Sequence, residues 1–388
     1  MQYFFIPGRL QDLSTEELKS VLKIFSKSKY SVDATNKGFI LVDSDCSAET
    51  MREIFNRLGG FVKFGKILSE QEERDFLNKY LSKGRITFGV SRVGIESGPI
   101  KVKKLATEIK DYFKQNNVSA RYVGGKGFAF LSSAEISGNK VLENGFEIVN
   151  LETRVGDLLT GNTVAVQDID DFTKRDYGRP VADKKMGMLP TKLARIMLNL
   201  AELESGSTIW DPFCGSGTIL TEALLMGYNA LGSDIDEYAV KGAYKNIKWL
   251  SQNYNLGDTK YSVFESDVMR PNKPLQKKLR YTSVNAMIFE PYMGPPQHRV
   301  MSAYTAEELL TNVMSLYKEI FTFAERINSP NLKAVFVVPS YKTKKGWATI
   351  RYNTFLSKRW KVHNREGLHW SRSNSIIRRN ILIANLKK

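Results

Sequence analysis

Short apolar strands and amphipathic helices are mixed along the first 165 residues. The apolar positions of residues 1–67 predict strands and helices in turn at 3–6, 14–26, 38–42, 48–58 and 61–67. Ser14-Thr-Glu-Glu17 has the form of a capping box and predicts the start of the first helix. Residues 68–165 predict strands at 85–91, 119–123 and 128–131 and a basic amphipathic helix at 100–116. We therefore expect two small α+β units.

A different pattern follows residues 166–187, which are polar and rich in turn-forming residues and are predicted to be a linker. From residue 188 to 388, helices and strands alternate, at 193–203, 208–210, 218–226, 230–233, 237–253, 261–264, 286–289, 306–327 and 333–338. This alternation predicts an α/β fold with a doubly wound, mostly parallel sheet and a ligand at the carboxyl ends of its strands. Apolar runs at 360–363 and 376–386 predict a hairpin that completes the sheet.

Composition narrows the class of protein. With 42% apolar residues and no low-complexity tract, the 388-residue chain is long enough for two or three globular domains. No apolar run approaches the roughly 20 residues that span a bilayer, and the opening residues are too few for a signal-peptide core. Cys46 and Cys214 are too few for a disulfide framework, and the histidines show no metal-ligand spacing. We expect a cytoplasmic protein without a metal or a membrane contact, and a monomer by default.

The net charge of +16 is distributed unevenly. Residues 74–130 carry about +8 and residues 341–388 about +12, whereas residues 181–340 sum to about +1. Two basic segments on either side of a neutral one predict a bound anionic macromolecule, with nucleic acid as the leading candidate. Trp360 and Trp370 lie within the second basic segment, where they could stack on exposed bases or belong to the core.

The segment Asp211-Pro-Phe-Cys-Gly-Ser-Gly-Thr218 lies between a predicted strand and a predicted helix. Gly215 and Gly217 lack side chains, so the backbone can approach a ligand closely. Leu220 replaces the third glycine of the dinucleotide motif, and no Lys-Ser or Lys-Thr pair follows as in a phosphate loop. Asp211 would repel a pyrophosphate but could accept a hydrogen bond from an ammonium group. S-adenosylmethionine carries an ammonium group and a sulfonium cation, and it is the predicted ligand.

Acids also follow the next two predicted strands. Asp234 lies about 23 residues after Asp211, close to the spacing of roughly 20 residues at which a carboxylate meets ribose hydroxyls. Its competitor Asp236 is better placed to cap the following helix. Asp267 ends the third strand, where its carboxylate could accept a hydrogen bond from an adenine amino group. This repeated placement predicts a cofactor site at the carboxyl edge of the sheet.

Phe289-Glu-Pro-Tyr-Met-Gly-Pro-Pro296 follows the fourth predicted strand. Methylation of an exocyclic amine on a base is difficult because the nitrogen lone pair is delocalised into the ring. Glu290 and the Pro291 carbonyl could accept the amine protons while Tyr292 stacks on the base, although a proline-rich turn with a buried tyrosine has the same pattern. Cys214 could suggest a cytosine-C5 nucleophile, but it does not follow the fourth strand and is interpreted as a packing residue.

The segments DPFCGSGT, GSDID and ESDV together resemble the Rossmann-type methyltransferases. RDYGRP…GMLPTKLARIMLNLA followed by WDPFCGSGTILTEAL is similar to the THUMP-domain tRNA guanosine N2-methyltransferases, the guanosine-10 group and its bacterial relatives. The resemblance implies a ferredoxin-like domain (1–67), a THUMP RNA-binding domain (68–165), a linker (166–187) and a Rossmann-type methyltransferase domain (188–388). It implies methyl transfer from S-adenosylmethionine to the N2 amino group of a tRNA guanosine, at position 10. Glu-Pro-Tyr stands here in place of the family's Asp-Pro-Pro-Tyr.

Motifs and resemblance together assign three groups of residues. Cofactor contacts are expected at Asp211, Pro212, Gly215, Gly217, Thr218, Asp234, Ile235, Asp267 and Val268. Catalysis is expected at Glu290, Pro291 and Tyr292. RNA contacts are expected at Lys101, Lys103, Lys104, Arg121, Lys126, Arg372 and Arg378. Two alternatives stay open, namely methylation of adenine N6 in RNA or DNA and a non-catalytic tRNA-binding protein that retains the fold.

Overall fold

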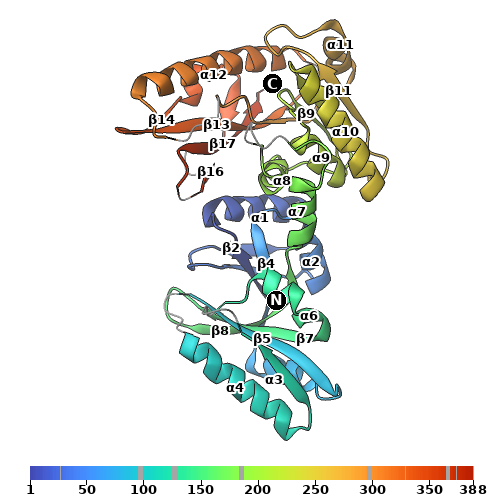
Figure 1. Cartoon of the computed structure of the whole chain (residues 1–388), viewed down its shortest axis with the longest axis vertical. Helices are drawn as coiled ribbons and strands as arrows, with labels where there is room; N and C mark the ends of the chain where they lie inside the picture. Colours follow the sequence, from blue (N-terminus) through green and yellow to red (C-terminus); the bar gives the residue numbers. More distant parts are fainter. Residues whose placement is uncertain are drawn as a thin grey trace. The chain divides into compact units, whose positions relative to one another are not determined.

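The computed structural model describes residues 1–26, 28–94, 99–124, 130–182, 188–294, 299–327, 329–363, 368–372 and 374–387. The chain divides into two compact units, Met1–Asp171 and Phe172–Lys388. Figure 1 traces both units from the blue N-terminus to the red C-terminus. Within the described ranges, no helix combines the length and the hydropathy needed to cross a bilayer.

The first unit contains an eight-stranded sheet in its described part. Its strands are β1 (Gln2–Pro7), β2 (Tyr30–Asp33), β3 (Ile40–Ser44), β4 (Phe61–Leu68), β5 (Arg85–Val93), β6 (Ser119–Val123), β7 (Gly145–Glu152) and β8 (Leu158–Val166). Its helices are α1 (Gln11–Phe25), α2 (Ala48–Arg57), α3 (Glu70–Asn78), α4 (Pro99–Gln115), α5 (Ser133–Gly138) and α6 (Val141–Asn144). The strand order is β2-β3-β1-β4-β8-β7-β5-β6, and only β5 runs parallel to its neighbours β6 and β7. The predicted units 1–67 and 68–165 thus share one sheet, joined where β4 pairs with β8.

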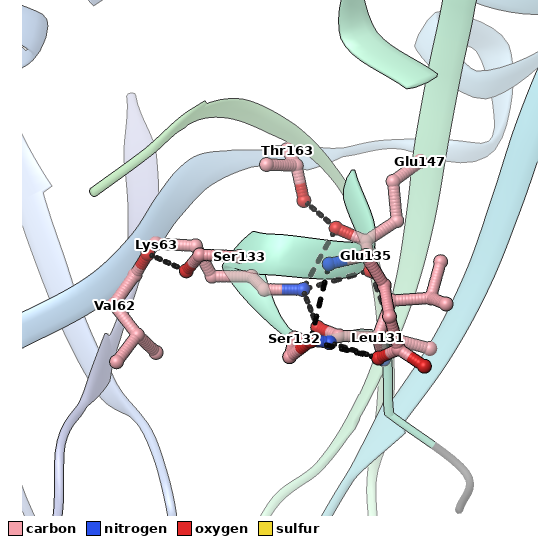
Figure 2. A network of polar contacts seen from close by, with 9 residues as sticks. Val62, Lys63, Leu131, Ser132, Ser133, Glu135, Glu147 and Thr163 are labelled. Atoms are coloured by element: carbon pink, nitrogen blue, oxygen red, sulfur yellow. Dashed lines mark hydrogen bonds and ion pairs between the residues drawn. The ribbon is translucent and has the colours of Figure 1, made fainter. Parts of the chain in front are cut away.

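A buried ion pair lies close to this junction (Figure 2). The Lys63 Nζ of β4 lies 2.8 Å from a carboxylate oxygen of Glu147 on β7, and both side chains are 0% exposed. Glu147 also accepts hydrogen bonds from the hydroxyls of Ser91 on β5 and Thr163 on β8. Lys63 donates a further bond of 2.8 Å to the backbone oxygen of Leu131. Burial lowers the pKa of Lys63, and the Glu147 charge opposes that shift. Four strands are thereby tied to one charged pair.

The pair makes a testable prediction about stability. Replacing one partner, as in Lys63→Met, leaves the other charge buried without compensation and should cost about 3–5 kcal/mol of unfolding free energy. The double variant Lys63→Met/Glu147→Leu should lose less, because neither charge remains. Urea unfolding measures both. The control Lys19→Met removes a surface pair with Glu16, in which both side chains are about half exposed, and should cost at most about 1 kcal/mol. Equal losses in Lys63→Met and Lys19→Met would contradict this account.

The second unit contains a nine-stranded sheet in its described part. Its strands are β9 (Thr208–Asp211), β10 (Asn229–Asp234), β11 (Tyr261–Glu265), β12 (Ala286–Phe289), β13 (Lys333–Thr343), β14 (Gly346–Thr349), β15 (Trp360–Val362), β16 (His369–Trp370) and β17 (Ile377–Leu386). Its helices are α8 (Thr191–Leu200), α9 (Thr218–Leu225), α10 (Glu237–Asn253), α11 (Lys273–Tyr281) and α12 (Ala303–Ala324), with a 3-10 turn at Tyr352–Thr354. Helix α7 (Ile169–Tyr177) spans the boundary between the two units.

The strand order β11-β10-β9-β12-β13-β17-β15 confirms the predicted doubly wound, mostly parallel sheet. Strands β11, β10, β9, β12 and β13 are parallel, while β17 runs antiparallel to β13 and β15 as the predicted hairpin. Leu231 of β10 packs in the cluster formed with α11 and α12, whereas a Cβ on the next residue, Gly232, would meet Leu220 of α9 at 2.5 Å. Helices therefore cover both faces of this sheet, as Figure 1 also shows.

The predicted capping box at the start of the first helix is wrong. Helix α1 begins at Gln11, so Ser14 and Glu17 do not cap it. Both side chains instead bind a turn of the same unit, since Ser14 donates to the Gly60 oxygen and Glu17 accepts from the N–H groups of Gly59 and Gly60. The residue pattern of a capping box thus serves a tertiary contact.

The segment predicted to be a linker, residues 166–187, includes helix α7. Its polar composition conceals a helical spacing in which Phe172 and Arg175 are both buried. The strand expected at 128–131 is not formed at its described residues 130 and 131, and residues 128 and 129 lie outside the described ranges.

Candidate active site

The carboxyl ends of the parallel strands bring the predicted site residues to one edge of the second unit. Asp211 ends β9 and Asp234 ends β10, which pair in parallel register with Gly232 opposite Asp211. Glu290 directly follows β12, the neighbour of β9 on its other side. The order β10-β9-β12 therefore places Asp211 between the other two acids along the edge.

The loop after β9 turns through two glycines with positive φ. Gly215 has a φ of 50° and Gly217 a φ of 83°, where Gly217 forms the N-cap of α9. The Gly215 N–H donates to the Asp234 carboxylate over 2.8 Å, which joins the loop to the neighbouring strand end. A Cβ built on Gly215 would meet no atom within 4 Å, whereas one on Gly217 would lie 3.1 Å from the Ala243 Cβ. Gly217 therefore allows tight helix packing, and Gly215 faces open space that a ligand can enter.

Asp211 and Asp234 are carboxylates in an unfavourable setting for negative charge. Burial raises the pKa of Asp211 well above its ordinary value, the charges of Asp234 and Glu290 add to the shift, and a hydrogen bond from the Phe213 N–H opposes it. Burial also raises the pKa of Asp234, against bonds from the N–H groups of Asp236 and Gly215. Within the described part of the chain, neither acid forms an ion pair. The ionised form of these acids is thus disfavoured until a cation compensates it, which suits a cationic ligand.

The remaining predicted cofactor contacts surround these acids in different environments. Asp267 is half-buried and accepts from the Met269 N–H over 2.8 Å. Val268 is buried, whereas Ile235 is exposed. Asp236 caps α10 by accepting from the Tyr238 N–H, as expected, and this leaves Asp234 as the acid at the strand end.

Thr218 introduces a contact that the sequence did not reveal. Its hydroxyl oxygen accepts a hydrogen bond of 2.8 Å from the Arg179 guanidinium. Arg179 is only 5% exposed, and burial lowers its pKa. A buried cation thus lies beside the first turn of α9. Its position in the polar segment before α8 carries no periodic signal by which it could have been found.

Glu290 is held by a residue that was not assigned to the catalytic group. The Arg379 Nε lies 2.5 Å from one Glu290 oxygen, and its terminal nitrogen Nη2 lies 3.3 Å from the other. Pro291 is buried and Tyr292 is 59% exposed, so the alternative of a buried tyrosine in this turn is wrong. The buried Tyr341 hydroxyl donates to the backbone oxygen of Met293 over 2.8 Å and fixes the segment beyond Tyr292.

The predicted RNA contacts fall into two groups in separate units. Lys101, Lys103 and Lys104 are exposed on α4, and Arg121 is exposed on β6. In the second unit, Arg372 is exposed, and the Arg378 guanidinium lies 4.4 Å from the centre of the Trp347 ring. Lys126 lies outside the described residues.

Two further interpretations concern aromatic and sulfur side chains. Trp360 packs in the core against Phe321 of α12, so its proposed stacking on bases is wrong. Trp370 is half-buried on β16. Cys214 is buried, which confirms its packing role, and burial raises the pKa of its thiol. Across the described ranges, no cluster of three or more His, Cys, Asp or Glu residues could hold a metal ion.

Comparisons with known proteins first identify the class. Residues 179–267 match the RMKL-like methyltransferase domain. The crystal structure of TrmN from Thermus thermophilus has a similar fold, with a TM-score of 0.56 and 14% identity over 100% of both chains. Together with the glycine loop and the strand-end acids, this defines the chain as a protein of the Rossmann-type methyltransferase class.

Curated relatives then identify the family. The tRNA (guanine(10)-N2)-dimethyltransferase of Methanothermobacter thermautotrophicus is 30% identical over 187 residues, 48% of this chain and 47% of that protein. The probable tRNA (guanine(10)-N2)-dimethyltransferase of Methanothermococcus thermolithotrophicus is 31% identical over 35% of this chain and 82% of that protein. The chain belongs to this family of tRNA guanine-N2 methyltransferases. It spans less than half the length of the first of these relatives.

Asp211→Asn should separate stability from ligand binding. Because burial raises the Asp211 pKa, folding is favoured while the group is protonated, and that stability is lost as the pH rises through the raised pKa. The amide does not titrate and can still accept the Phe213 N–H. In thermal unfolding without ligand, the melting temperature of the variant should therefore rise relative to that of the parent chain as the pH increases above the ordinary pKa of an aspartate, about 4. By calorimetry it should bind S-adenosylmethionine about 10- to 100-fold more weakly.

Asp236→Asn is the matched control, since asparagine caps a helix as well as aspartate does, the Asp236 side chain is exposed, and the variant keeps the backbone N–H that donates to Asp234. Its melting temperature and cofactor affinity should follow the parent chain. Unchanged cofactor affinity in Asp211→Asn would rule out a contact between Asp211 and the ligand.

Proposed function

We propose that the chain transfers a methyl group from S-adenosylmethionine to the exocyclic N2 amino group of guanosine 10 in tRNA. The observation that carries the proposal is the adjacency of two groups at one sheet edge. The buried Asp211 and the glycine loop lie at the end of β9, and Glu290-Pro291-Tyr292 follows its neighbour β12. The names of the curated relatives support the choice of guanosine and of position 10. The proposed location, the cytoplasm, is consistent with a tRNA substrate.

The residues at the carboxyl edge fit S-adenosylmethionine. The carboxylates of Asp211 and Asp234 have no cationic partner in the described part of the chain, and the ligand brings an ammonium group and a sulfonium. When bound, it supplies an electrophilic methyl group. Asp211 would accept from the ammonium group, Asp234 from ribose hydroxyls and Asp267 from the adenine amino group. The open space beside Gly215 admits the ligand next to the backbone.

The segment after β12 would hold the target base. A carboxylate oxygen of Glu290 and the Pro291 carbonyl accept hydrogen bonds from the N–H groups of the amine. These bonds orient the amine nitrogen toward the methyl donor. The exposed ring of Tyr292 is free to stack on a base taken out of its helix. Orientation and hydrogen bonding supply most of the rate, and no covalent intermediate with the chain is needed.

Basic side chains outside this edge would bind the tRNA. Lys101, Lys103 and Lys104 on α4 and Arg121 on β6 would contact phosphates, with residues 1–67 and 68–165 acting as ferredoxin-like and THUMP domains. Arg372 and Arg378 would contact the same RNA in the second unit. Lys126 belongs to the same proposed group.

Incubation with methyl-labelled S-adenosylmethionine and an unmodified tRNA transcript tests the function. Mass spectrometry of the digested nucleosides should find N2-methylguanosine or its dimethyl form, and a transcript with adenosine at position 10 should remain unlabelled. N6-methyladenosine as the product would replace this function by the adenine alternative. Binding of tRNA without binding of the cofactor would favour a non-catalytic RNA-binding protein.

Tyr292→Ala should reduce turnover of tRNA without destabilising the fold, because the side chain is 59% exposed. Loss of one base–aromatic stack, about 1–3 kcal/mol, corresponds to a drop of about 5- to 150-fold in kcat/KM for tRNA. Tyr292→Phe keeps the ring and should stay within about threefold of the parent chain. Steady-state kinetics at saturating cofactor measure both variants, and a similar kcat/KM in the two would remove Tyr292 from the proposed base contact.

A further inference from the structure

Two adjacent arginines on β17 point to opposite faces of the sheet. Successive side chains of a strand alternate between its faces, so Arg378 and Arg379 cannot share an environment. Arg378 lies over the Trp347 ring of β14, whereas Arg379 reaches the Glu290 carboxylate beyond β12. In sequence the two residues are equivalent members of a basic run. In the structure, Arg379 reaches the site where the target amine is proposed to bind.

The Arg379–Glu290 contact has the geometry of a two-point clamp. Nε and Nη2 of Arg379 each contact a different Glu290 oxygen, at 2.5 Å and 3.3 Å. The side chains are 18% and 12% exposed, so water competes little for these bonds. A planar guanidinium bound at two points fixes the plane of a carboxylate, which a single bond would leave free to rotate. Each carboxylate oxygen has two lone pairs, and one bond to Arg379 leaves a lone pair for another donor.

The Arg379–Glu290 ion pair also affects the distribution of charge near Asp211. The Glu290 charge is near enough to raise the pKa of the buried Asp211. Of these two acids, Glu290 has an arginine partner, and Asp211 has no cation within the described part of the chain. Arg379 therefore leaves Glu290 as an oriented acceptor with a balanced charge, while the uncompensated charge stays at the strand ends that face the glycine loop.

We propose that Arg379 is a positioning residue for the reaction, which holds the Glu290 carboxylate in the orientation that accepts the target amine. This inference rests on the proposed function of Glu290. It also explains why a glutamate stands here in place of the family's shorter aspartate, since the carboxylate must reach both the arginine on β17 and the amine. Arg379 acts through Glu290 and touches neither the cofactor nor the base.

The test is a double-mutant cycle on the full chain with tRNA and S-adenosylmethionine. Arg379→Gln should lower kcat about 10- to 100-fold, because a misplaced acceptor costs orientation, and should leave the calorimetric affinity for S-adenosylmethionine within about threefold. Arg379→Lys keeps the charge without the two-point geometry and should recover part of kcat. In a Glu290→Gln background, Arg379→Gln should change kcat less than about threefold, because its target is already removed.

A matched control removes a different arginine from an ion pair of similar burial. Arg92 lies 3.1 Å from Glu152 in the first unit, with side chains 12% and 24% exposed. Arg92→Gln should have the kcat of the parent chain, and its thermal unfolding calibrates the loss of one such pair. A loss of melting temperature in Arg379→Gln no larger than in this control, together with the loss of kcat, supports positioning.

Three outcomes would overturn the inference. They are a kcat of Arg379→Gln equal to that of Arg92→Gln, an equal loss of kcat with and without Glu290, or a loss of cofactor affinity that matches the loss of kcat. The proposed function fails in a different way, namely when the parent chain itself makes no N2-methylguanosine. Even then, crystal structures of the parent chain and Arg379→Gln report whether the Glu290 carboxylate keeps its orientation, and an unchanged orientation would refute the clamp.

Discussion

Negative charge at the carboxyl edge of the parallel sheet is only partly neutralised by the protein itself. Asp211 and Asp234 end neighbouring strands, and burial raises the pKa of both. A folded chain tolerates such a cost where a ligand compensates it. The positive φ of Gly215, its N–H bond to Asp234 and the open space beside it all serve that opening. Under the proposed function, the loop after β9 brings the cationic ligand next to these two carboxylates.

In the first unit, two buried charges neutralise each other. Lys63 and Glu147 are both fully buried, but they compensate each other, and the hydroxyls of Ser91 and Thr163 complete the bonding of the carboxylate. No ligand is needed there, and the pair links β4 with strands contributed by residues 68–165. Strand β6 with its basic Arg121 belongs to this continuous sheet, and the basic helix α4 belongs to the same unit.

The sequence predicted the second unit well because its strands are buried on both faces and its helices have regular apolar spacing. Helix α10 and strand β12 begin and end at the predicted residues, and the strand-end positions of Asp211 and Asp234 follow from that regularity. The single sheet of the first unit was not predictable, because pairing of β4 with β8 joins segments about a hundred residues apart and leaves no local signal. Ser14 and Glu17 failed for the same reason, since their partners lie in a distant turn.

The candidate site shows the same limit at the level of single side chains. Acids at strand ends can be read from sequence, because a strand and its last residue are local features. The partner of Glu290 cannot, since Arg379 is 89 residues away and is distinguished from Arg378 only by the face of β17 that it occupies. That difference decides the chemistry of the edge. Without Arg379, Glu290 would be a third uncompensated acid, and a cationic ligand would be attracted to the acceptor site as well as to the glycine loop. With it, Glu290 has a compensating cation, whereas Asp211 has none in the described part of the chain. Under the proposed function, a cationic ligand is therefore drawn to the loop, and Glu290 remains available to a neutral amine.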